Sequence, residues 1–376
     1  MAFLASPRKI PGYFSQYGYA FSWRRLWNCA KVLSSMAVSW LVRRPVVWGQ
    51  PFMLMVEPTN FCNLKCPLCP SGNGQMTRHR GNMELADFKQ LIDQVGDYLV
   101  LLMLWNQGEP FINKCFLEMV RYARSKRIPT LTSTNGHYIR DLEQARAVVE
   151  SGLDEIIVSL DGVDQETYEK YRVGGKIERV LSGVRLLSQA KRELKAKTPL
   201  INLQFIVFRH NQDDLGAAER IAQEVGADKF LVKTAQVYSA SEAEQFLPDE
   251  GNFRRYQSSS GVSGEESEAD PGDLIVKGQP ARGCKVLWYS SMVNWNGAVA
   301  PCCFDKDVDY EMGRTAIGDS ETSSGASVQS FSEIWRGRAY MDFREQVLAD
   351  RAAFDMCRNC SEGYRGMFSL VEEFRS

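Results

Sequence analysis

The sequence predicts an α/β fold, a partial (β/α)6 TIM-like barrel followed by a small C-terminal cysteine-rich α+β domain. Six short apolar runs alternate with helical patterns between residues 52 and 250. Such an alternation indicates a parallel sheet with helices on its outside. Three cysteines follow the first apolar run, and five more lie after residue 280. Because chemistry in such barrels lies at the C-terminal ends of the strands, we expect the first cysteines to mark the functional site.

The strands of the barrel are expected where apolar runs are continuous, as is typical of strands buried on both faces. These runs are 52–57, 100–105, 128–134, 155–160, 200–208 and 229–233. Helical patterns between them cover 84–95, 111–127, 139–150, 164–191 and 213–225. The fourth helical pattern contains Gly174 and Gly175, where we expect the helix to break.

A basic arm, residues 1–51, precedes the barrel, which we assign to 52–250. Up to residue 56 the chain has seven Lys or Arg residues and no acid. Because the whole chain has a net charge of −1, residues 57–376 have a net charge of −8. Residues 22–44 fit an amphipathic helix. Its apolar positions are Trp23, Leu26, Trp27, Ala30, Leu33, Ala37, Trp40 and Leu41, and Arg24, Arg25, Lys31 and Arg43 are expected on the opposite side.

The helix of this arm has three interpretations. It packs over the main domain, it lies on an anionic membrane with tryptophan at the interface, or it belongs to an organelle transit peptide of similar composition. No run approaches the roughly 18 apolar residues that a membrane span requires. The apolar run MAVSWLV is too short, and too far from the N-terminus, for a secretory signal.

Two polar segments rich in Gly, Ser and acidic residues interrupt the rest of the chain. Residues 257–273 lie within a stretch, 251–279, that we expect to be a flexible linker, and residues 318–330 have a similar composition. The C-terminal domain is therefore assigned to 280–376.

The composition predicts a globular protein of a reducing compartment. Hydrophobic residues make up 44% of the chain and charged residues 24%, and the net charge of −1 excludes a global nucleic-acid signature. Ten cysteines in clustered patterns indicate metal binding rather than a disulfide framework. His79, His137 and His210 are the three histidines, which we expect on loops without a role. Cys29 and Cys115 are expected as buried apolar residues of helices.

The stretch FCNLKCPLCP, residues 61–70, places Cys62, Cys66 and Cys69 in a C-x3-C-x2-C array. Iron–sulfur clusters are held by thiolates, usually four for a 4Fe–4S cluster. Three thiolates from one short loop would leave one iron open to a substrate or cosubstrate. A zinc ion with a distant fourth ligand is the alternative for the same spacing.

The segment EPTNFCNLKCPLCPSG resembles the signature of the radical S-adenosylmethionine (SAM) superfamily. The resemblance implies that Cys62, Cys66 and Cys69 hold a 4Fe–4S cluster whose fourth iron binds the amino and carboxylate groups of SAM. It further implies reductive cleavage of SAM to a 5′-deoxyadenosyl radical, which abstracts a hydrogen atom from substrate. Leu68 would shield the cluster, and a flavodoxin or ferredoxin would donate the electron.

Further matches to this family follow the next strands. NQGEPF (106–111) resembles its G-G-E-P motif, with Gln107 in place of the first glycine, and STNG (133–136) and SLDG (159–162) resemble segments that line the SAM site. The resemblance implies that the SAM-binding residues are Gly108, Glu109, Ser133, Asn135, Ser159, Asp161 and Arg172. Glu109 would accept hydrogen bonds from the methionine ammonium, and Arg172 would pair with the carboxylate. A helix N-terminal acid, plain turns and a solvated arginine are the alternative roles.

The C-terminal cysteines, with NGAVAPCC and SFSEIWRG, resemble the SPASM or shorter Twitch domain that binds an auxiliary cluster. The implied ligands of one auxiliary 4Fe–4S cluster are Cys284, Cys302, Cys357 and Cys360, and the absence of cysteine from residues 361–376 favours the Twitch-like form. A structural zinc is the alternative. Cys303 and Asp305 are the candidates for a catalytic role toward substrate, although Asp305 also suits a turn.

Together these features predict a radical SAM enzyme of the oxidoreductase type that oxidises or rearranges a small molecule, such as a sugar, lipid or specialised metabolite. A maturase acting on a peptide or protein is the second hypothesis, and the helical arm does not resemble the three-stranded peptide-recognition wing of many such enzymes. A non-catalytic zinc-binding scaffold on a membrane is the third. We expect a cytoplasmic location, with the N-terminal helix as a candidate peripheral contact on the inner face of the membrane.

Overall fold

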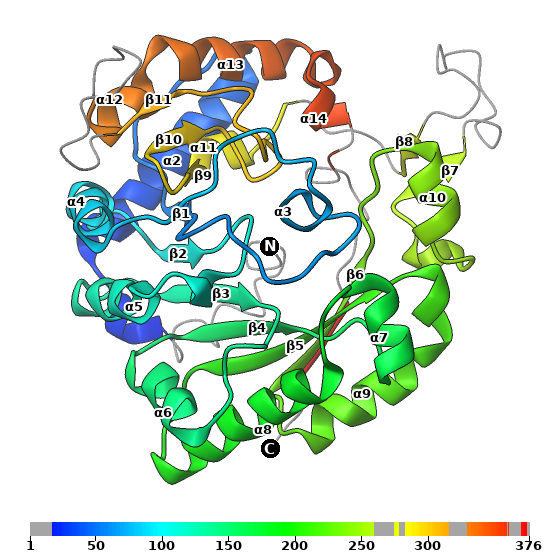
Figure 1. The fold of residues 1–376 in the computed structure, drawn as a ribbon. Coiled ribbons are helices and arrows are strands. Elements are labelled where there is room, and N and C mark those ends of the chain that lie inside the picture. The colour runs from blue at the N-terminus through cyan, green and yellow to red at the C-terminus, as the bar shows by residue number, and fades with distance from the viewer. Residues whose placement is uncertain are drawn as a thin grey trace.

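A single sheet of ten strands organises the molecule (Figure 1). The computed structural model describes residues 17–258, 274–277, 283–315, 329–358, 360 and 370–373. The strand order is β11-β10-β9-β1-β2-β3-β4-β5-β6-β12. The bounds of the first six strands are β1 Met53–Val56, β2 Leu101–Leu104, β3 Thr130–Thr134, β4 Glu155–Ser159, β5 Leu200–Val207 and β6 Lys229–Thr234. These six are parallel to one another, which confirms the partial barrel and all six predicted strands.

Helices cover the outside of the barrel (Figure 1). They are α4 Leu85–Val95, α5 Phe116–Ser125, α6 Leu142–Glu150, α7 Gln165–Tyr171, α8 Ile177–Glu193 and α9 Leu215–Glu224. The predicted break at Gly174 is confirmed, because Gly174 has a φ of +81° between α7 and α8. The expected helix 111–127 starts late: a 3-10 turn, η4 Pro110–Ile112, precedes α5. Shorter elements are η3 Gly18–Ala20, α3 Pro70–Asn73, η5 Arg209–Asp214, α10 Ala240–Phe246 and η6 Gly251–Phe253.

The C-terminal region continues the barrel sheet at both of its edges. Strand β9 (Ser290–Val293) pairs in parallel with β1, and β10 (Ala298–Ala300) and β11 (Gly313–Arg314) follow in antiparallel order. Strand β12 (Leu370–Glu373) pairs antiparallel with β6 at the other edge. The helices of this region are α11 Val286–Tyr289, α12 Phe331–Arg336, α13 Arg338–Ala349, η8 Arg351–Ala353 and α14 Asp355–Arg358. The region from 280 onward is thus distinct in composition but continuous with the barrel in hydrogen bonding.

Part of the expected linker is ordered. Strands β7 (Tyr256–Ser258) and β8 (Leu274–Val276) form a two-stranded antiparallel sheet within the stretch expected to be a linker. Tyr256 and Val276 are buried in an apolar cluster that also contains Phe208, which explains why they hold a fixed position. The predicted polar segments 259–273 and 318–328 lie outside the described residues.

The N-terminal arm forms helix α2 (Trp23–Val42), close to the predicted bounds, but its orientation is not the expected one. The side that packs on the body carries Arg25, Asn28, Val32, Ser35 and Ser39, all buried. Arg25, predicted on the solvent side, is 8% exposed, because four backbone carbonyls accept hydrogen bonds from its guanidinium. No helix among the described residues has the length and apolar character needed to cross a bilayer.

The two ends of the barrel differ in character. At the N-terminal ends of the strands, the Tyr17 hydroxyl donates a hydrogen bond to buried Glu155, which also accepts one from Asn202 Nδ2 at 3.0 Å. Tyr19 donates to Asp154 at 2.8 Å beside them. These polar contacts lie at the N-terminal ends of the strands, whereas the three-cysteine loop follows the C-terminal end of β1.

Candidate active site

The loop after β1 brings its three cysteines against three different barrel elements. Each sulfur lies beside a polar side chain of a neighbouring element: Cys62 Sγ is 3.9 Å from Asn135 Nδ2, Cys66 Sγ is 3.8 Å from Arg172 Nη1, and Cys69 Sγ is 3.7 Å from Gln107 Oε1. The loop folds tightly because Gly72 leaves room for the backbone of Cys66; a Cβ atom there would lie 2.6 Å from the Cys66 nitrogen.

The all-sulfur donor set of this loop fits an iron–sulfur cluster. Burial raises the pKa of Cys62 to about 12 and also raises that of Cys66. Bound iron would supply the positive charge that stabilises the thiolates. Among the described residues, no three His, Cys, Asp or Glu side chains converge tightly enough for a single metal ion. Three thiols from one loop are the donor type that iron–sulfur clusters use.

Glu109 lies buried at the mouth of the barrel, next to the three-cysteine loop. Its carboxylate accepts hydrogen bonds from Thr134 Oγ1 at 2.8 Å and from the Asn135 backbone N–H at 2.7 Å. Burial raises the pKa of Glu109 to about 7, although these hydrogen bonds oppose the shift. The neighbouring Gly108 has a φ of +81°, and a Cβ there would lie 2.6 Å from the carbonyl oxygen of Thr59. A glycine is thus required where the G-G-E-P-like segment meets the cysteine loop.

Asp161 and Arg172 form a buried ion pair on the other side of the loop. Arg172 Nε donates to Asp161 Oδ2 at 2.6 Å, and the side chains are 13% and 0% exposed, respectively. The second Asp161 oxygen accepts the Ile206 backbone N–H at 2.7 Å. Both oxygens of Asp161 thus accept hydrogen bonds, and the carboxylate holds Arg172 beside Cys66. The Nη1 atom of the Arg172 guanidinium lies beside the Cys66 sulfur.

The remaining predicted SAM-site residues lie at the same end of the barrel. Ser133 and Ser159 are in β3 and β4, and Asn135 directly follows β3. Asn135 contacts both the cysteine loop and Glu109, since its Nδ2 donates to Asn63 Oδ1 at 2.9 Å and its backbone N–H donates to Glu109. The structure thus brings the predicted residues together around one opening.

The auxiliary cysteines also come together, from segments far apart in the sequence. Cys284 precedes α11, Cys302 follows β10, and Cys357 and Cys360 lie in and after α14. Burial raises the pKa of Cys302 well above its usual range, and the nearby Cys303, Cys360 and Cys284 raise it further. Burial, reinforced by Cys284, raises the pKa of Cys357 to about 11. Cys303, Cys360 and Cys284 are therefore electrostatic neighbours of Cys302, and Cys284 is also a neighbour of Cys357.

A cavity of about 430 Å³ is lined by residues that neighbour both groups of cysteines in the sequence. Its lining residues come from several segments: Leu68 and Pro70 from the first loop, Phe304–Asp307, Asp309 and Tyr310 from the auxiliary region, Met356 from α14, and Gln236 and Tyr238 from the segment after β6. Asp305 is in this wall, but its two oxygens accept the backbone N–H groups of Asp309 and Tyr310, at 2.8 and 3.0 Å. Burial raises the pKa of Asp305 to about 6. Through these two hydrogen bonds Asp305 stabilises the turn that follows it in the chain.

Sequence reasoning missed Lys306 in this cavity. Its ammonium donates a hydrogen bond to the Tyr238 hydroxyl and lies 4.2 Å from the centre of the Tyr238 ring. Burial lowers the pKa of Lys306 to about 8. The sequence CCFDKD held only a weak signal, because a lysine between two aspartates reads as a solvated turn.

Arg78 was missed as well. Its guanidinium donates to both oxygens of Glu57 at 2.6 Å, and its Nε donates to the Lys306 carbonyl oxygen at 2.7 Å. Glu57 is fully buried at the end of β1. Arg78 therefore ties the start of the three-cysteine loop to the auxiliary region, and Thr77 adds a second tie by donating its N–H to Asp307 at 2.9 Å.

The expectations for the histidines and isolated cysteines are only partly right. His137 lies on a loop but is buried, and its Nε2 accepts the Lys176 backbone N–H at 2.8 Å, so it does have a structural role. His210 lies in η5 rather than on a loop. Cys29 is in α2 but is only partly buried, and Cys115 precedes α5 instead of lying inside it.

The fold and this site define a cluster-binding (β/α) barrel with a second cysteine-rich region. Residues 56–206 match the radical SAM superfamily, and residues 284–361 match the SPASM iron–sulfur cluster-binding domain. The chain therefore belongs to the radical SAM superfamily and carries a C-terminal SPASM domain. This confirms the predicted family and cofactors: an iron–sulfur cluster with SAM, and an auxiliary cluster. The individual ligand and SAM-contact residues stay predictions.

Curated relatives show similarity over different shares of the chain. A PqqA peptide cyclase of Granulibacter bethesdensis is 28% identical over 50% of this chain and 48% of its own length. A protein of Pyrococcus furiosus, named tungsten-containing aldehyde ferredoxin oxidoreductase cofactor-modifying protein, is 24% identical over 82% of this chain and 86% of its own. An AdoMet-dependent heme synthase of Methanosarcina barkeri is 27% identical over 48% and 50%. The chain thus spans about half the length of the first and third of these relatives.

Solved structures support the fold. Streptococcus suis SuiB bound to S-adenosylmethionine is 14% identical, with a TM-score of 0.54 over 79% of this chain and 68% of SuiB. The enzyme anSMEcpe with bound AdoMet is 15% identical, with a TM-score of 0.54 over 84% of this chain and 92% of its own. At this level of identity the likeness concerns architecture alone.

Proposed function

We propose that this radical SAM enzyme abstracts a hydrogen atom from a small molecule bound in the cavity between the two groups of cysteines, and that it oxidises or rearranges that molecule. The observation that carries the proposal is the cavity itself. Its volume of about 430 Å³ lies within the range of about 300–1,000 Å³ typical of small-molecule sites. Leu68, which is next to Cys69, lines one part of the cavity, and the loop that follows Cys302 and Cys303 lines another.

The chain's own residues prepare two neighbouring sites. When bound, SAM and the clusters supply one-electron chemistry, including the radical that removes a substrate hydrogen atom and an acceptor for the electron that an oxidised substrate releases. Glu109 is held with its carboxylate at the barrel mouth, where it can accept hydrogen bonds from the methionine ammonium. Arg172, held by Asp161, is placed to pair with the carboxylate. Apolar Leu68 stands between this site and the cavity and limits the access of water.

We assign to Lys306 the role of binding the substrate and accepting its proton. Oxidation by loss of a hydrogen atom and an electron also releases a proton, which needs an acceptor. The Asp305 oxygens are occupied by backbone N–H groups, whereas the Lys306 amine, with a pKa of about 8, faces the cavity beside Tyr238. In its neutral form this amine can accept the proton, and in its charged form it can bind an oxygen-rich or anionic substrate group.

A peptide substrate is the second candidate, because a PqqA peptide cyclase is among the relatives. The described part of the N-terminal arm, from residue 17, is helical and contains no strand, so it offers no three-stranded wing for a peptide there. This favours the small-molecule assignment. We also infer a cytoplasmic location and an external one-electron donor such as flavodoxin or ferredoxin, since the chemistry consumes electrons.

The assignment of the first cluster is tested by replacing Cys62, Cys66 and Cys69 together with Ala. Under dithionite, we expect the anaerobically reconstituted triple variant to lose 5′-deoxyadenosine formation and to keep about four irons on the auxiliary cysteines. Unchanged 5′-deoxyadenosine would refute the assignment of the first cluster. An iron-free variant would refute the auxiliary cluster, and zinc in its place would support the structural-zinc alternative.

The substrate class is tested by adding cell extract fractions to the wild-type enzyme and measuring 5′-deoxyadenosine formation in excess of the unstimulated rate. Stimulation by a protease-treated fraction of low molecular mass is the expected result. Stimulation only by fractions that protease treatment inactivates would favour the peptide assignment and contradict ours.

A further inference from the structure

Helix α2 turns its apolar side toward solvent. Five large apolar residues, at positions that share one side of the helix, are exposed: Trp23 76%, Leu26 48%, Trp27 65%, Leu33 42% and Leu41 83%. We call these five the outer stripe. Ala30 and Ala37 are also exposed and continue it between the larger residues. Since scattered apolar residues are normal on surfaces but a continuous row is not, the stripe indicates an interaction surface.

Polar contacts on the buried side fix this orientation. Arg25 donates to the carbonyl oxygens of Ala20, Gly96, Lys126 and Arg127, at distances of 2.5–3.1 Å. Two further buried side chains on the same side are anchored to the body. Asn28 exchanges two hydrogen bonds with the backbone of Gln50, at 2.8 and 2.9 Å. The Ser39 hydroxyl accepts from Trp288 Nε1 at 3.0 Å. Turning the helix to bury the stripe would leave these polar groups without partners, which is costly.

Basic residues accompany the stripe. Arg24 and Lys31 are one heptad apart, so they share one flank of it, and Arg43 and Arg44 follow at its C-terminal end; all four are exposed. No acid occurs before residue 57, although Asp97 pairs with Arg24 at 2.5 Å. The seven basic residues before residue 57 include these four, which are exposed on or next to α2, and the remainder of the chain has a net charge of −8. A row of Trp and Leu with Lys and Arg beside it is complementary to an anionic lipid surface.

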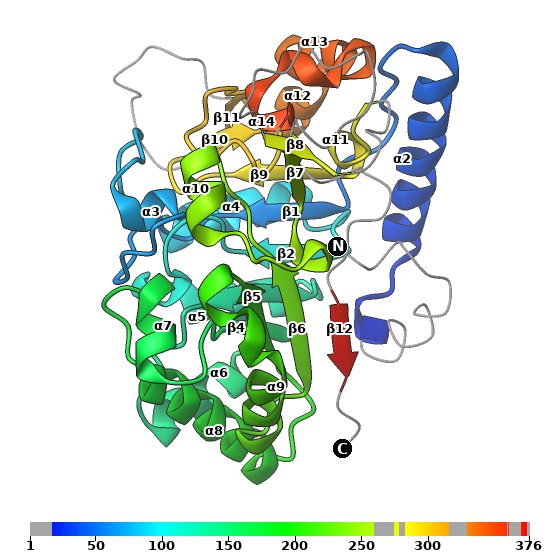
Figure 2. The ribbon, with the colours of Figure 1, turned by 90° about the vertical axis from the view of Figure 1, so that its right-hand side faces the viewer.

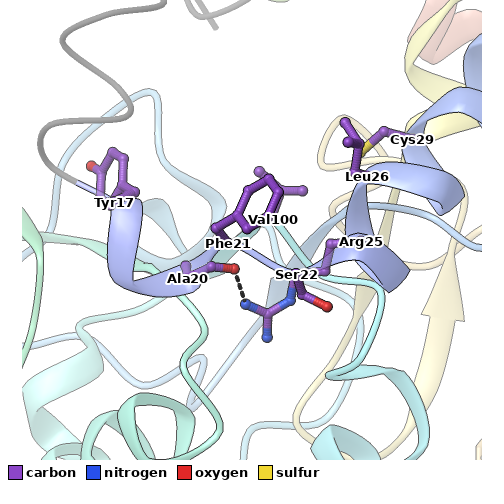
Figure 3. A pocket seen from close by; sticks show the side chains of 8 residues that line it. All are labelled: Tyr17, Ala20, Phe21, Ser22, Arg25, Leu26, Cys29 and Val100. Carbon is purple, nitrogen blue, oxygen red and sulfur yellow. Dashed lines mark hydrogen bonds between the residues drawn. The ribbon is translucent and has the colours of Figure 1, made fainter.

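An apolar cavity opens at the start of the same helix (Figure 3). Its volume is about 180 Å³, and Phe21, Leu26, Cys29 and Val100 form its walls together with the backbone turn that Arg25 holds. Leu26 belongs both to this cavity and to the outer stripe. The cavity gives the surface room to accept an apolar chain end, which a bilayer can supply.

We propose that α2 docks the protein on an anionic lipid bilayer, with the helix parallel to the surface and the outer stripe inserted at the headgroup–acyl boundary. The 20 residues of α2 give a contact about 30 Å long. Trp23 and Trp27 occupy the interfacial depth that tryptophan prefers, and Lys31, Arg43 and Arg44 bind lipid phosphates. This docking does not depend on the reaction proposed above.

The orientation of the docked enzyme follows from the position of α2. Its contacts to Gly96, Lys126 and Arg127 are with the loops that precede β2 and β3, at the N-terminal ends of the strands. The cysteine loop follows the C-terminal end of β1, and α2 and α3 lie on opposite sides of the molecule (Figure 2). The active-site opening would therefore face away from the bilayer, so that substrate enters from the aqueous side.

Vesicle flotation of the reconstituted full chain tests this docking. We expect the wild type to float with vesicles of phosphatidylcholine and phosphatidylglycerol in equal parts, and at least tenfold less with pure phosphatidylcholine. The variant Trp23→Ser/Trp27→Ser/Leu41→Ser should lose at least tenfold in bound fraction. The matched control is Leu194→Ser, another exposed apolar residue, 38% exposed at the end of α8, which should bind as the wild type does. Circular dichroism verifies that each variant is folded.

Three results would overturn the proposal. The first is a wild type that stays free of anionic vesicles at low salt, and the second is a triple variant that binds them as the wild type does. The third is a dimer, detected by light scattering without lipid, that the triple variant dissociates while vesicle binding is absent. This last result would show that the stripe receives a second copy of the chain.

Discussion

The buried pair of Arg78 and Glu57 yields a prediction whose magnitude can be worked from the structure. The guanidinium and carboxylate make two hydrogen bonds of 2.6 Å, with side-chain exposures of 12% and 0%. The same guanidinium holds the Lys306 carbonyl oxygen at 2.7 Å. Replacing Arg78 by Met keeps an apolar chain of similar length in the site but leaves Glu57, among the residues that the structure describes, with the Gln107 backbone N–H at 3.3 Å as its hydrogen-bond donor.

Removing one partner of a buried ion pair costs about 3–5 kcal/mol, because the remaining charge stays desolvated. A change of 1 kcal/mol moves the melting temperature by about 2 °C in domains somewhat smaller than this chain. We therefore expect Arg78→Met to lower the melting temperature by about 6–10 °C. The double variant Glu57→Gln/Arg78→Met should recover part of this loss, since no carboxylate is then left unpaired.

The assay is thermal unfolding followed by circular dichroism, under anaerobic conditions and at matched iron content. Arg80→Met is the control: Arg80 belongs to the same loop and is exposed, with one hydrogen bond to the Ser71 carbonyl oxygen at 3.0 Å. That variant should shift the melting temperature by about 2 °C or less, as is usual for surface changes. A shift for Arg78→Met no larger than that of the control would show that the pair does not stabilise the fold as argued.

Two further predictions concern ligand binding. Glu109→Gln should weaken SAM binding by about 10- to 100-fold, the equivalent of one charge-assisted hydrogen bond, as measured by anaerobic equilibrium dialysis. The pKa of Glu109 is about 7, and only the ionised carboxylate neutralises an ammonium. The affinity of the wild type for SAM should therefore fall as the pH drops below 7. An equally steep fall in the affinity of the Glu109→Gln variant would contradict this. Lys306→Met should abolish a titration near pH 8 in the kcat/KM profile, since burial lowers the pKa of Lys306 to about 8; an unchanged profile would remove Lys306 from the proposal.

The barrel was predictable because its signals are local and strong. Strands buried on both faces are continuous apolar runs, and β1 shows this plainly, with all four residues buried. The cysteine loop was predictable for the same reason, since three ligands within eight residues need no knowledge of tertiary contacts. The auxiliary cysteines come from distant segments, and only their resemblance to a family pattern indicated that they would meet.

Features decided by long-range contacts were not accessible from the sequence. Helical periodicity showed that α2 is amphipathic, but apolar burial is only one way to dock a helix. Here three of the four carbonyl acceptors for Arg25 lie about 70 to 100 positions away in the chain, and they help to decide which side is buried. Lys306 and Arg78 were missed for a similar reason, because an isolated basic residue in a polar loop gives no sign of the buried partner that it meets.

The contacts of Arg78 also explain how the two cysteine-bearing regions keep a defined separation. The sheet joins them on one side through the parallel pairing of β1 with β9. On the other side Arg78 and Thr77 hold the backbone of Lys306 and the side chain of Asp307, and Trp295 Nε1 adds a hydrogen bond to the His79 carbonyl oxygen at 3.3 Å. If the substrate binds in this cavity as proposed, the width of the cavity must be fixed, because radical chemistry depends on the position of one carbon–hydrogen bond. Loss of Arg78 should therefore lower the yield of product per 5′-deoxyadenosine formed more than it lowers SAM cleavage itself.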